Sequence, residues 1–243
     1  MNKPNYGFDA PSVMRNLLIF GILAILIGIF IPNFSENIWL KYLSFLIIFG
    51  GVILAILGTS MVIYGLTGKY RVREMMLNKI AWKGNEMVLD IGTGTGLLMN
   101  GAATRLTTGK SIGIDIWRAE DLSDNTLANT LRNAELENVS DKIEILTEDV
   151  RNLSFADNTF DVILSQFCIH NIDNKLEEEK ACFEIARVLK PGGIALIGDY
   201  IPTHEYAKYL AKAGLKVKSS KNYISTALSM TWMVEATKLK TNG

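Results

Sequence analysis

The sequence predicts an α/β protein with a doubly wound sheet, preceded by a transmembrane α-helical hairpin. Three observations support this prediction. Two long apolar runs lie within residues 1–69, and beyond them short apolar strands alternate with amphipathic helices. A glycine-rich turn follows the first of those strands, as at the ligand-binding edge of a parallel sheet.

The composition of the chain excludes several classes of protein. Its 243 residues include 25 Lys and Arg against 25 Asp and Glu, with no basic run, so we expect no nucleic-acid partner. Two cysteines, Cys168 and Cys182, and two histidines, His170 and His204, are too few for a disulfide framework or a clustered metal site. Hydrophobic residues make up 49% of the chain, which excludes a disordered protein.

The first apolar run, Leu17–Ile31, has fifteen residues without a charged or polar side chain. It covers about 22 Å of a hydrocarbon core of about 30 Å, and a start at Val13 with Arg15 reaching outward gives spanning length. The second run, Ile38–Tyr64, is long enough to cross with some tilt. We therefore expect a tail over 1–12 and a transmembrane hairpin over 13–66, with spans of about 13–32 and 38–64.

Three other interpretations of the apolar runs are open. A cleaved signal peptide requires a small-residue cleavage site, but here a second, longer run follows. An interfacial helix requires a polar face, which the first run lacks. A pair of buried core helices is compatible with the shortness of that run. In the hairpin interpretation, the positive-inside rule predicts that both termini and the following domain are cytoplasmic. The basic residues that support this orientation are Lys3, Arg15, Lys69, Arg71 and Arg73.

Residues 67–243 have the pattern of one α/β domain. Strands are expected at 87–91, 111–115, 142–146, 160–165 and 194–200, with helices near 96–106, 123–136 and 174–189. A helix at 203–213 follows, and then two segments, 216–224 and 227–238, that resemble a hairpin returning to the sheet edge. This alternation is typical of a parallel sheet covered on both faces.

The turn from Asp90 to Gly96, which reads DIGTGTG, is the most informative motif. Glycine allows a sharp turn and close approach of a ligand, and the N–H groups at the following helix favour an anionic group. Asp115 ends the next strand, where a carboxylate can accept hydrogen bonds from ribose hydroxyls. The motif therefore predicts a Rossmann-like nucleoside site. A dinucleotide fingerprint would require glycine where Leu97 stands.

The G-x-G-x-G spacing, with Asp90 two residues before the first glycine, resembles motif I of the class I S-adenosylmethionine-dependent methyltransferases. Three later segments resemble the family in the same order, namely 147–150 (TEDV), 160–165 (FDVILS) and 187–193 (RVLKPGG). The resemblance covers about residues 70–238 and is closest to the small-molecule branch that includes ubiquinone/menaquinone-type C-methyltransferases. It implies a seven-stranded sheet with an antiparallel last strand.

The resemblance also implies S-adenosyl-L-methionine as the cofactor. The glycine loop would lie against its methionine part, Asp115 would hold the ribose hydroxyls, and Asp149 would accept from the adenine amino group. Taken singly, each of these two carboxylates is equally compatible with an ordinary exposed loop. Their positions at strand ends after a glycine loop favour cofactor binding. The implied cofactor-binding residues are Asp90, Gly92, Gly94, Gly96, Asp115, Ile116, Asp149, Val150 and Ser165.

The segment after the fourth expected strand, 165–171, would face the methyl group and the acceptor in the family fold. Methyl transfer mainly requires alignment of the nucleophile, so a catalytic base is optional. His170 is the candidate base, because an unperturbed histidine titrates near cellular pH; alternatively it bonds a loop backbone or caps the next helix. Gln166, Tyr200 and His204 are candidates for the acceptor pocket, although His204 could simply open the helix 203–213.

These features predict a membrane-anchored methyltransferase that acts on a small-molecule or lipid-like acceptor. The Asn/Asp-Pro-Pro-aromatic motif of adenine- and glutamine-methylating relatives is replaced by SQFC at 165–168, which disfavours those acceptors. Cys168 is expected to be a small buried apolar residue. Two alternatives are an anchored cofactor-binding scaffold without turnover and a nicotinamide oxidoreductase, the latter opposed by Leu97.

Overall fold

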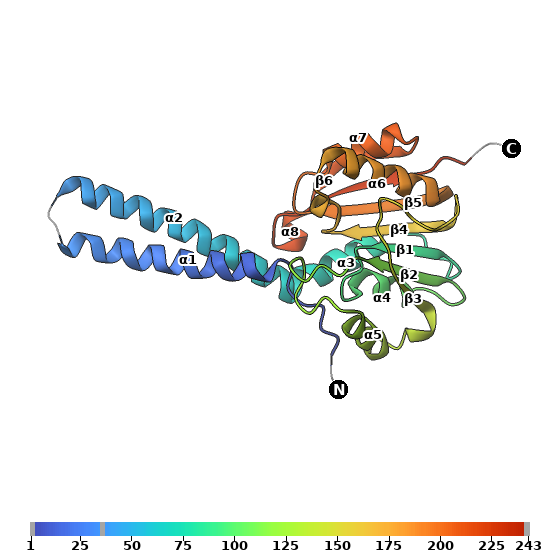
Figure 1. Ribbon diagram of the computed structural model, residues 1–243, viewed down its shortest axis with the longest axis horizontal. Coiled ribbons are helices and arrows are strands. Elements are labelled where there is room, and N and C mark those ends of the chain that lie inside the picture. Colours follow the sequence, from blue (N-terminus) through green and yellow to red (C-terminus); the bar gives the residue numbers. More distant parts are fainter. Residues whose placement is uncertain (1–2, 35–36, 241–243) are drawn as a thin grey trace.

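A long pair of antiparallel helices projects from a globular α/β part (Figure 1). The computed structural model describes residues 3–34 and 37–240. Residues 1–2 of the expected tail, 35–36 between the two expected spans, and 241–243 of the expected domain therefore lie outside the described residues. Helix α1 spans Pro11–Phe30, a 3₁₀ turn η1 spans Ile31–Phe34, and α2 spans Ile38–Ile63. Both helices are long enough and apolar enough, by length and composition, to cross a membrane.

Small residues line the contact between α1 and α2. A Cβ atom on Gly21 would lie 2.9 Å from the carbonyl oxygen of Gly51, and one on Gly51 would lie 2.8 Å from that of Gly21. The two backbones therefore touch where no side chain fits. The buried residues of the pair are Gly21, Gly28, Ser44, Gly51 and Gly58, whereas large apolar side chains such as Phe45 and Phe49 are exposed.

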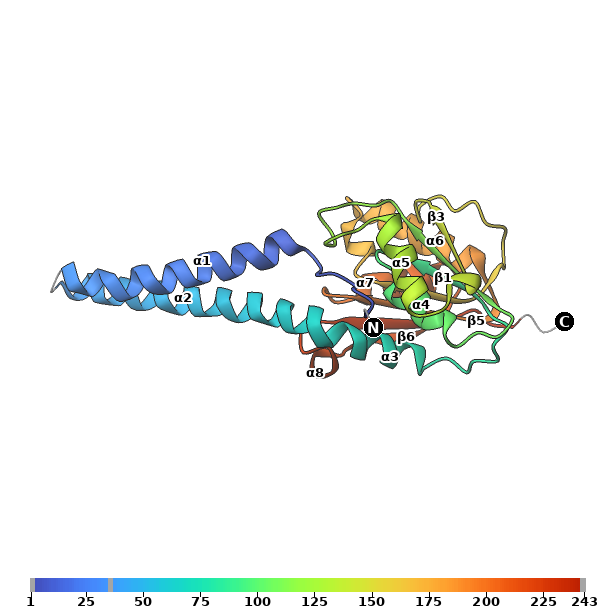
Figure 2. The same ribbon diagram turned by 90° about the horizontal axis from the view of Figure 1, so that it is seen from below.

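Helix α2 enters the globular part without an intervening loop. It continues through a π-helical turn, η2 (Tyr64–Gly68), into α3 (Lys69–Leu77), and Figure 2 shows this continuous path. A short helix, α8 (Ile224–Ala227), packs directly on the turn, because a Cβ atom on Gly68 would lie 1.9 Å from the carbonyl oxygen of Ala227.

The globular part is built on a seven-stranded sheet of order β3-β2-β1-β4-β5-β7-β6. Strands β1 to β5 are parallel, and β7 runs antiparallel to both of its neighbours, as predicted. The strands are β1 (Met87–Ile91), β2 (Lys110–Asp115), β3 (Ile143–Thr147), β4 (Phe160–Gln166), β5 (Leu189–Asp199), β6 (Lys216–Asn222) and β7 (Trp232–Thr237).

Helices cover both faces of this sheet and form its core. On one face α3, α4 and α8 bury apolar side chains against β1, β4 and β5, and on the other α6 and α7 do so. Helix α5 packs beside α4 near β3. The remaining bounds are α4 (Leu97–Ala103), α5 (Leu127–Leu136), η3 (Ser140–Lys142), η4 (Ile169–Asn171), α6 (Lys175–Val188) and α7 (His204–Lys212).

Three elements begin four or five residues away from the start that the sequence predicts. The expected helix 123–136 begins only at Leu127, because Asp124 has a left-handed backbone and Thr126 caps the helix. Strand β5 begins at Leu189 rather than 194, since Gly192 donates to the carbonyl of Lys238 at 2.7 Å and keeps the turn paired. The expected strand 227–238 begins at Trp232, because α8 and a loop precede it.

Candidate active site

The loops that follow β1, β2, β3 and β4 enclose a cavity at the carboxyl edge of the sheet. Parallel strands end at the same edge, so residues far apart in sequence meet there. Six of the nine predicted cofactor-binding residues line this cavity, namely Gly92, Gly94, Asp115, Ile116, Asp149 and Val150. Arg118 and Leu122, on the loop after β2, also line it.

The glycine loop adopts a conformation that other residues would not tolerate. Gly92, Gly94 and Gly96 have φ values of +69°, +53° and +91°, which are unfavourable for residues with a Cβ atom. A Cβ atom on Gly92 would also lie 2.5 Å from Cys168, and one on Gly94 would lie 2.6 Å from Leu122. The loop is therefore packed closely on both sides, and only glycine fits at these positions.

Asp90 lies beneath the glycine loop and holds it to the start of α4. Its carboxylate accepts hydrogen bonds from Thr93 Oγ1 and from the Met99 backbone N–H, both at 2.9 Å. The side chain is buried, and burial raises the pKa of Asp90 to about 7. The carboxyl group therefore fixes the glycine loop relative to α4, and its contribution to cofactor binding stays a prediction.

Asp115 joins the glycine loop to the loop after β2. One carboxylate oxygen accepts from the Gly94 N–H at 2.7 Å, and the other accepts from the Trp117 N–H at 2.6 Å. Each oxygen has a further lone pair, and the residue lines the cavity, so the carboxylate can also accept from a ligand. Ile116 is exposed beside it, as required for packing on an adenine ring.

Asp149 lies at the cavity but already has a cationic partner. Arg151 Nε donates to both carboxylate oxygens at 2.9 Å, and this pairing holds the pKa of Asp149 below its usual value. An adenine amino group would therefore have to share this carboxylate with Arg151. Neighbouring Val150 is buried in the cavity wall.

Ser165 lies outside the lining of the described cavities. Its side chain is fully buried, and its hydroxyl donates to the carbonyl of Ile91 at 3.1 Å, which ties β4 to β1. The next residue, Gln166, lines both the cofactor cavity and a second, adjoining cavity. The end of β4 thus points Gln166, not Ser165, toward open space.

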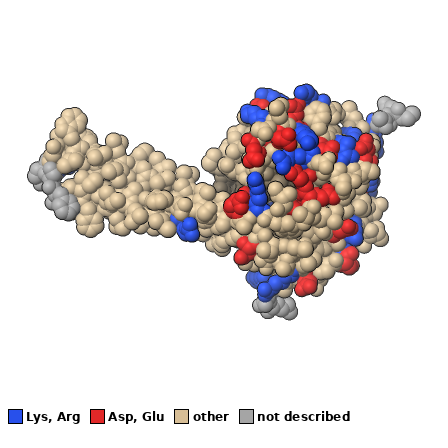
Figure 3. All heavy atoms as spheres, in the orientation of Figure 1, with Lys and Arg blue, Asp and Glu red and all other residues tan. Residues whose placement is uncertain are grey.

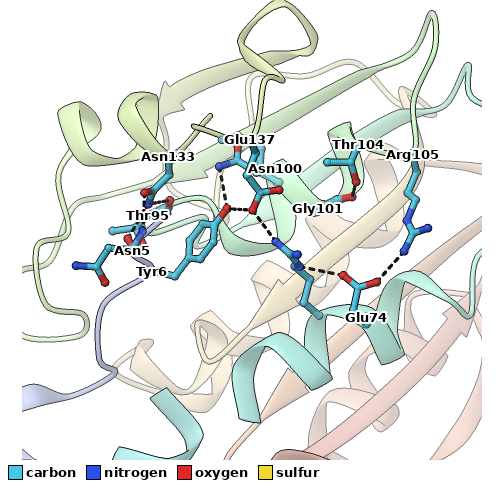
Figure 4. Close-up of polar contacts among 12 residues, drawn as sticks. Asn5, Tyr6, Glu74, Thr95, Asn100, Gly101, Thr104, Arg105, Asn133 and Glu137 are labelled. Atoms are coloured by element: carbon cyan, nitrogen blue, oxygen red, sulfur yellow. Dashed lines mark hydrogen bonds and ion pairs between the residues drawn. The ribbon is translucent and has the colours of Figure 1, made fainter. Parts of the chain in front are cut away.

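The segment that precedes α1 carries no sequence pattern that marks it as part of the site. Residues 3–10, hereafter the N-terminal strap, fold back onto the globular part (Figure 4). Asn133 on α5 donates to the carbonyl of Asn5 at 2.7 Å and to that of Thr95, in the glycine loop, at 3.0 Å. The buried Tyr6 hydroxyl donates to Glu137. Farther along, Phe8 and Ser123 exchange hydrogen bonds. The strap therefore reinforces the loops around the cofactor cavity.

The strap and the root of the hairpin form the wall of the second cavity. Tyr6, Asp9, Tyr64, Lys69 and Gln166 line it together with the glycine loop. Gln166 Nε2 donates to the Tyr64 hydroxyl at 3.4 Å, and Gln166 Oε1 is buried with no hydrogen-bond partner among the described residues. Tyr64 also packs on Phe167, with ring centroids 5.0 Å apart. This cavity adjoins the methionine end expected for the cofactor and is the candidate acceptor pocket.

The other candidate residues lie beside this site. His170 Nδ1 is 2.7 Å from a carboxylate oxygen of buried Asp199, and the His170 ring packs on Tyr200. His170 and Tyr200 do not belong to the lining of either cavity among the described residues. His204 lies exposed at the start of α7, 3.3 Å from Glu205. Of the three acceptor-pocket candidates, only Gln166 reaches a cavity.

Sequence and structure comparisons identify the same region. Residues 89–197 match the model of a methyltransferase domain. The chain is 29% identical over 66% of its length to phosphoethanolamine N-methyltransferase 1 of Triticum aestivum, covering 31% of that protein. It is 30% identical over 53% of its length to the ubiquinone/menaquinone biosynthesis C-methyltransferase UbiE of Roseobacter denitrificans, covering 48% of it. The chain thus spans less than half the length of these curated relatives.

A solved structure has the same fold. It is phosphoethanolamine N-methyltransferase 2 of Haemonchus contortus, in complex with phosphomonomethylethanolamine and S-adenosylhomocysteine. The TM-score is 0.57 at 18% identity, over 70% of this chain and 52% of that one. The domain match, the sheet order and the glycine loop agree in indicating a methyltransferase domain over residues 89–197, and S-adenosylmethionine is the cofactor that these features support.

Proposed function

We propose that this protein is a membrane-anchored methyltransferase that transfers a methyl group from S-adenosylmethionine to a small-molecule or lipid-like acceptor. The observation that carries the proposal is the position of Tyr64. This residue follows the last turn of the apolar helix α2, and it also contacts Gln166 and Phe167 at the end of β4. The root of the hairpin is thereby part of the candidate acceptor pocket.

The hairpin has the surface expected of a bilayer segment. In each of its helices only 11% of the most apolar window is buried, whereas the core helices of a soluble protein bury their apolar side chains. Glycines face inward and large apolar residues face outward, which is the arrangement that favours helix pairing in lipid. Figure 3 shows charged side chains concentrated on the globular part and nearly absent from the hairpin. These features support spans at about 13–32 and 38–64. The basic residues that flank the hairpin support a cytoplasmic position for residues 67–243 and both termini.

The residues of the site fit the cofactor. The bound cofactor would supply an electrophilic methyl group, so the protein has to orient the acceptor and exclude water. Asp90, Gly92, Gly94 and Gly96 would shape the methionine end, and Asp115 would hold the ribose. The strap would close the site above the glycine loop, because Asn133 bonds both Asn5 and Thr95.

The acceptor class follows from the pocket's position at the root of the hairpin. An apolar acceptor dissolved in the bilayer would reach Gln166 and Tyr64 from the adjoining lipid. The name of the Roseobacter denitrificans relative refers to quinones, which are apolar, whereas that of the wheat relative refers to a polar phosphobase. The apolar hairpin favours the former class.

The test is to incubate detergent-solubilised protein with methyl-labelled S-adenosylmethionine and a total lipid extract. We expect label in the organic phase, and Asp115→Ala should remove most of it when the cofactor concentration is near the wild-type Kd. Label only on water-soluble acceptors would contradict the lipid-like acceptor. Cofactor binding that depends on Asp115, without transfer to any membrane or soluble extract, would favour a scaffold without turnover.

A further inference from the structure

We propose that residues 223–231, hereafter the α8 segment, make a second contact with the bilayer at its headgroup region, beside the root of the hairpin. The proposal rests on the membrane anchoring proposed above and adds a surface to it. The occupant of this surface is the same bilayer that the hairpin would cross.

The α8 segment exposes apolar side chains that the fold leaves uncovered. Ile224, Leu228 and Met230 are 44%, 40% and 49% exposed. The segment reads YISTALSMT and has no charged side chain. Leu66, on the neighbouring turn η2, is also exposed. Apolar residues grouped in this way on a protein surface indicate a contact with a partner or a membrane.

The position of the segment identifies the bilayer as the partner. Ala227 packs with Tyr64 and Val72 in one apolar cluster, so α8 is held against the end of the hairpin. Figures 1 and 2 both show α8 beside the junction of α2 and α3. Because α2 enters the globular part through helical turns and no loop, a bilayer crossed by the hairpin would lie directly next to this surface.

The backbone conformation at Leu228 supports a role for its side chain in binding, and not in stabilising the fold. Leu228 ends α8 with φ +57° and ψ +25°, a left-handed conformation in which glycine or asparagine is favoured. A leucine here is disfavoured, and its exposed side chain gains little from internal packing. Conflicts of this kind between residue and conformation concentrate at functional positions.

The residues around the segment suit a headgroup interface. Exposed Lys221 lies two residues before it, and a lysine near apolar side chains is typical of surfaces that rest on anionic lipids. The contact would hold the carboxyl edge of the sheet toward the membrane. An apolar acceptor could then pass from lipid to the pocket at Tyr64 and Gln166 without crossing bulk water.

The test measures the depth of single fluorescent labels in nanodiscs of phosphatidylcholine and phosphatidylglycerol. The full chain, with both native cysteines replaced by alanine, carries the label at Met230→Cys, at Phe49→Cys in the centre of α2, or at Ala156→Cys before β4, at the opposite edge of the sheet. Lipids brominated near the headgroup should quench the label at 230, and lipids brominated deep in the acyl chain should quench the label at 49. The label at 156 should not be quenched.

The outcomes separate this proposal from the one on which it rests. Quenching at 49 with none at 230 would overturn the second contact and leave the anchoring intact. Absence of quenching at 49 would contradict the anchoring, and the second contact with it.

A substitution tests the same surface independently. Leu228→Asn removes the apolar side chain and places a residue that tolerates the left-handed backbone conformation. The melting temperature in detergent should therefore not fall. Methyl transfer to a lipid extract in vesicles should decrease about fivefold, with no change in detergent micelles. The matched control, Leu176→Asn, alters an exposed leucine on α6 and should change neither rate. A lowered melting temperature, or equal rates in vesicles, would overturn the proposal.

Discussion

The ammonium group of Lys69 forms an ion pair with the carboxylate of Asp9 at 3.0 Å, and this contact joins the two ends of the hairpin. Lys69 begins α3, just after the hairpin, and Asp9 belongs to the strap just before it. The ammonium group also donates to the carbonyls of Tyr6 at 3.0 Å and Gly7 at 2.9 Å. With only 3% of its side chain exposed, Lys69 is a fully satisfied buried cation.

We expect Lys69→Met to release the strap from the site. Removing the ammonium group leaves the two carbonyl oxygens without their donor and the Asp9 carboxylate without its counterion, so the free energy of unfolding should fall by about 2 kcal/mol. The affinity for S-adenosylmethionine should fall as well, because the strap reinforces the glycine loop through Asn133. Denaturant titration and calorimetry in detergent measure both effects. Lys83→Met, at an exposed position, is the control, and equal behaviour of the two variants would contradict this role.

Asp115→Ala should weaken cofactor binding. The carboxylate faces the cavity and holds the Gly94 and Trp117 N–H groups, so its loss removes a charged hydrogen-bond acceptor and loosens the loop. The Kd for S-adenosylmethionine should rise about tenfold or more. Isothermal titration calorimetry measures this change, with Glu120→Ala, an exposed carboxylate on the same loop, as the control. An unchanged Kd would refute the assignment of Asp115 to the ribose.

The stability of the protein should depend on pH through Asp90. Burial raises the pKa of this carboxyl group from 3.8 to about 7, so between these values the native state retains a proton that the unfolded chain releases. This contribution to stability is present at low pH and is lost as pH rises through about 7. From about pH 5 to about pH 8, the wild type should lose about 2 to 3 kcal/mol relative to Asp90→Asn.

Denaturant titrations of both proteins without cofactor give this difference. A difference that is independent of pH would show that Asp90 stays ionised in the native state.

Gln166 and Tyr64 should act together on the acceptor. Gln166→Leu removes the buried amide, and Tyr64→Phe removes only the hydroxyl, leaving the ring to pack on Phe167. Each change should lower kcat/KM for the labelled lipid product about tenfold, and Tyr64→Phe should leave the Kd of S-adenosylmethionine unchanged, because of the two cavities Tyr64 lines only the second. In the double mutant the two effects should be less than additive. Loss of cofactor affinity in Tyr64→Phe, with kcat/KM otherwise unchanged, would mean that the second cavity does not bind the acceptor.

His170→Gln tests for a general base. The carboxylate of Asp199 lies 2.7 Å from His170 Nδ1 and accepts from the His170 backbone N–H at 3.3 Å, so it fixes the position of this residue after the end of β4. If the imidazole takes a proton from the acceptor, kcat should fall about 100-fold while cofactor binding is retained. An unchanged rate would leave His170 as a packing partner of Tyr200.

Several parts of the fold and site could be read from local sequence. The alternation of apolar strands and helices predicted the doubly wound sheet, because burial on both faces requires continuous apolar strands. The positive φ angles of Gly92, Gly94 and Gly96 explain why glycine had to stand at those positions. Asp115 could be predicted at the cavity, since the carboxyl ends of parallel strands meet at one edge.

Other parts depend on contacts that leave no local pattern. Lys69 and Tyr6 are 63 positions apart and meet only because the hairpin reverses the chain between them. Neither residue belongs to a motif, so the sequence alone could not bring the strap to the site. Likewise His204, which sequence could place near the end of β5, faces solvent because α7 begins there.

The sequence by itself therefore determined the sheet, the glycine loop and the apolar hairpin, because periodicity and backbone conformation are local properties of the chain. Only the tertiary structure decided that the strap, η2 and the end of β4 share one cavity. The physical reason is that the wall of a cavity consists of side chains from elements that are distant in sequence. These side chains meet only when the elements pack together, and the residues next to them in sequence show no pattern that predicts this contact.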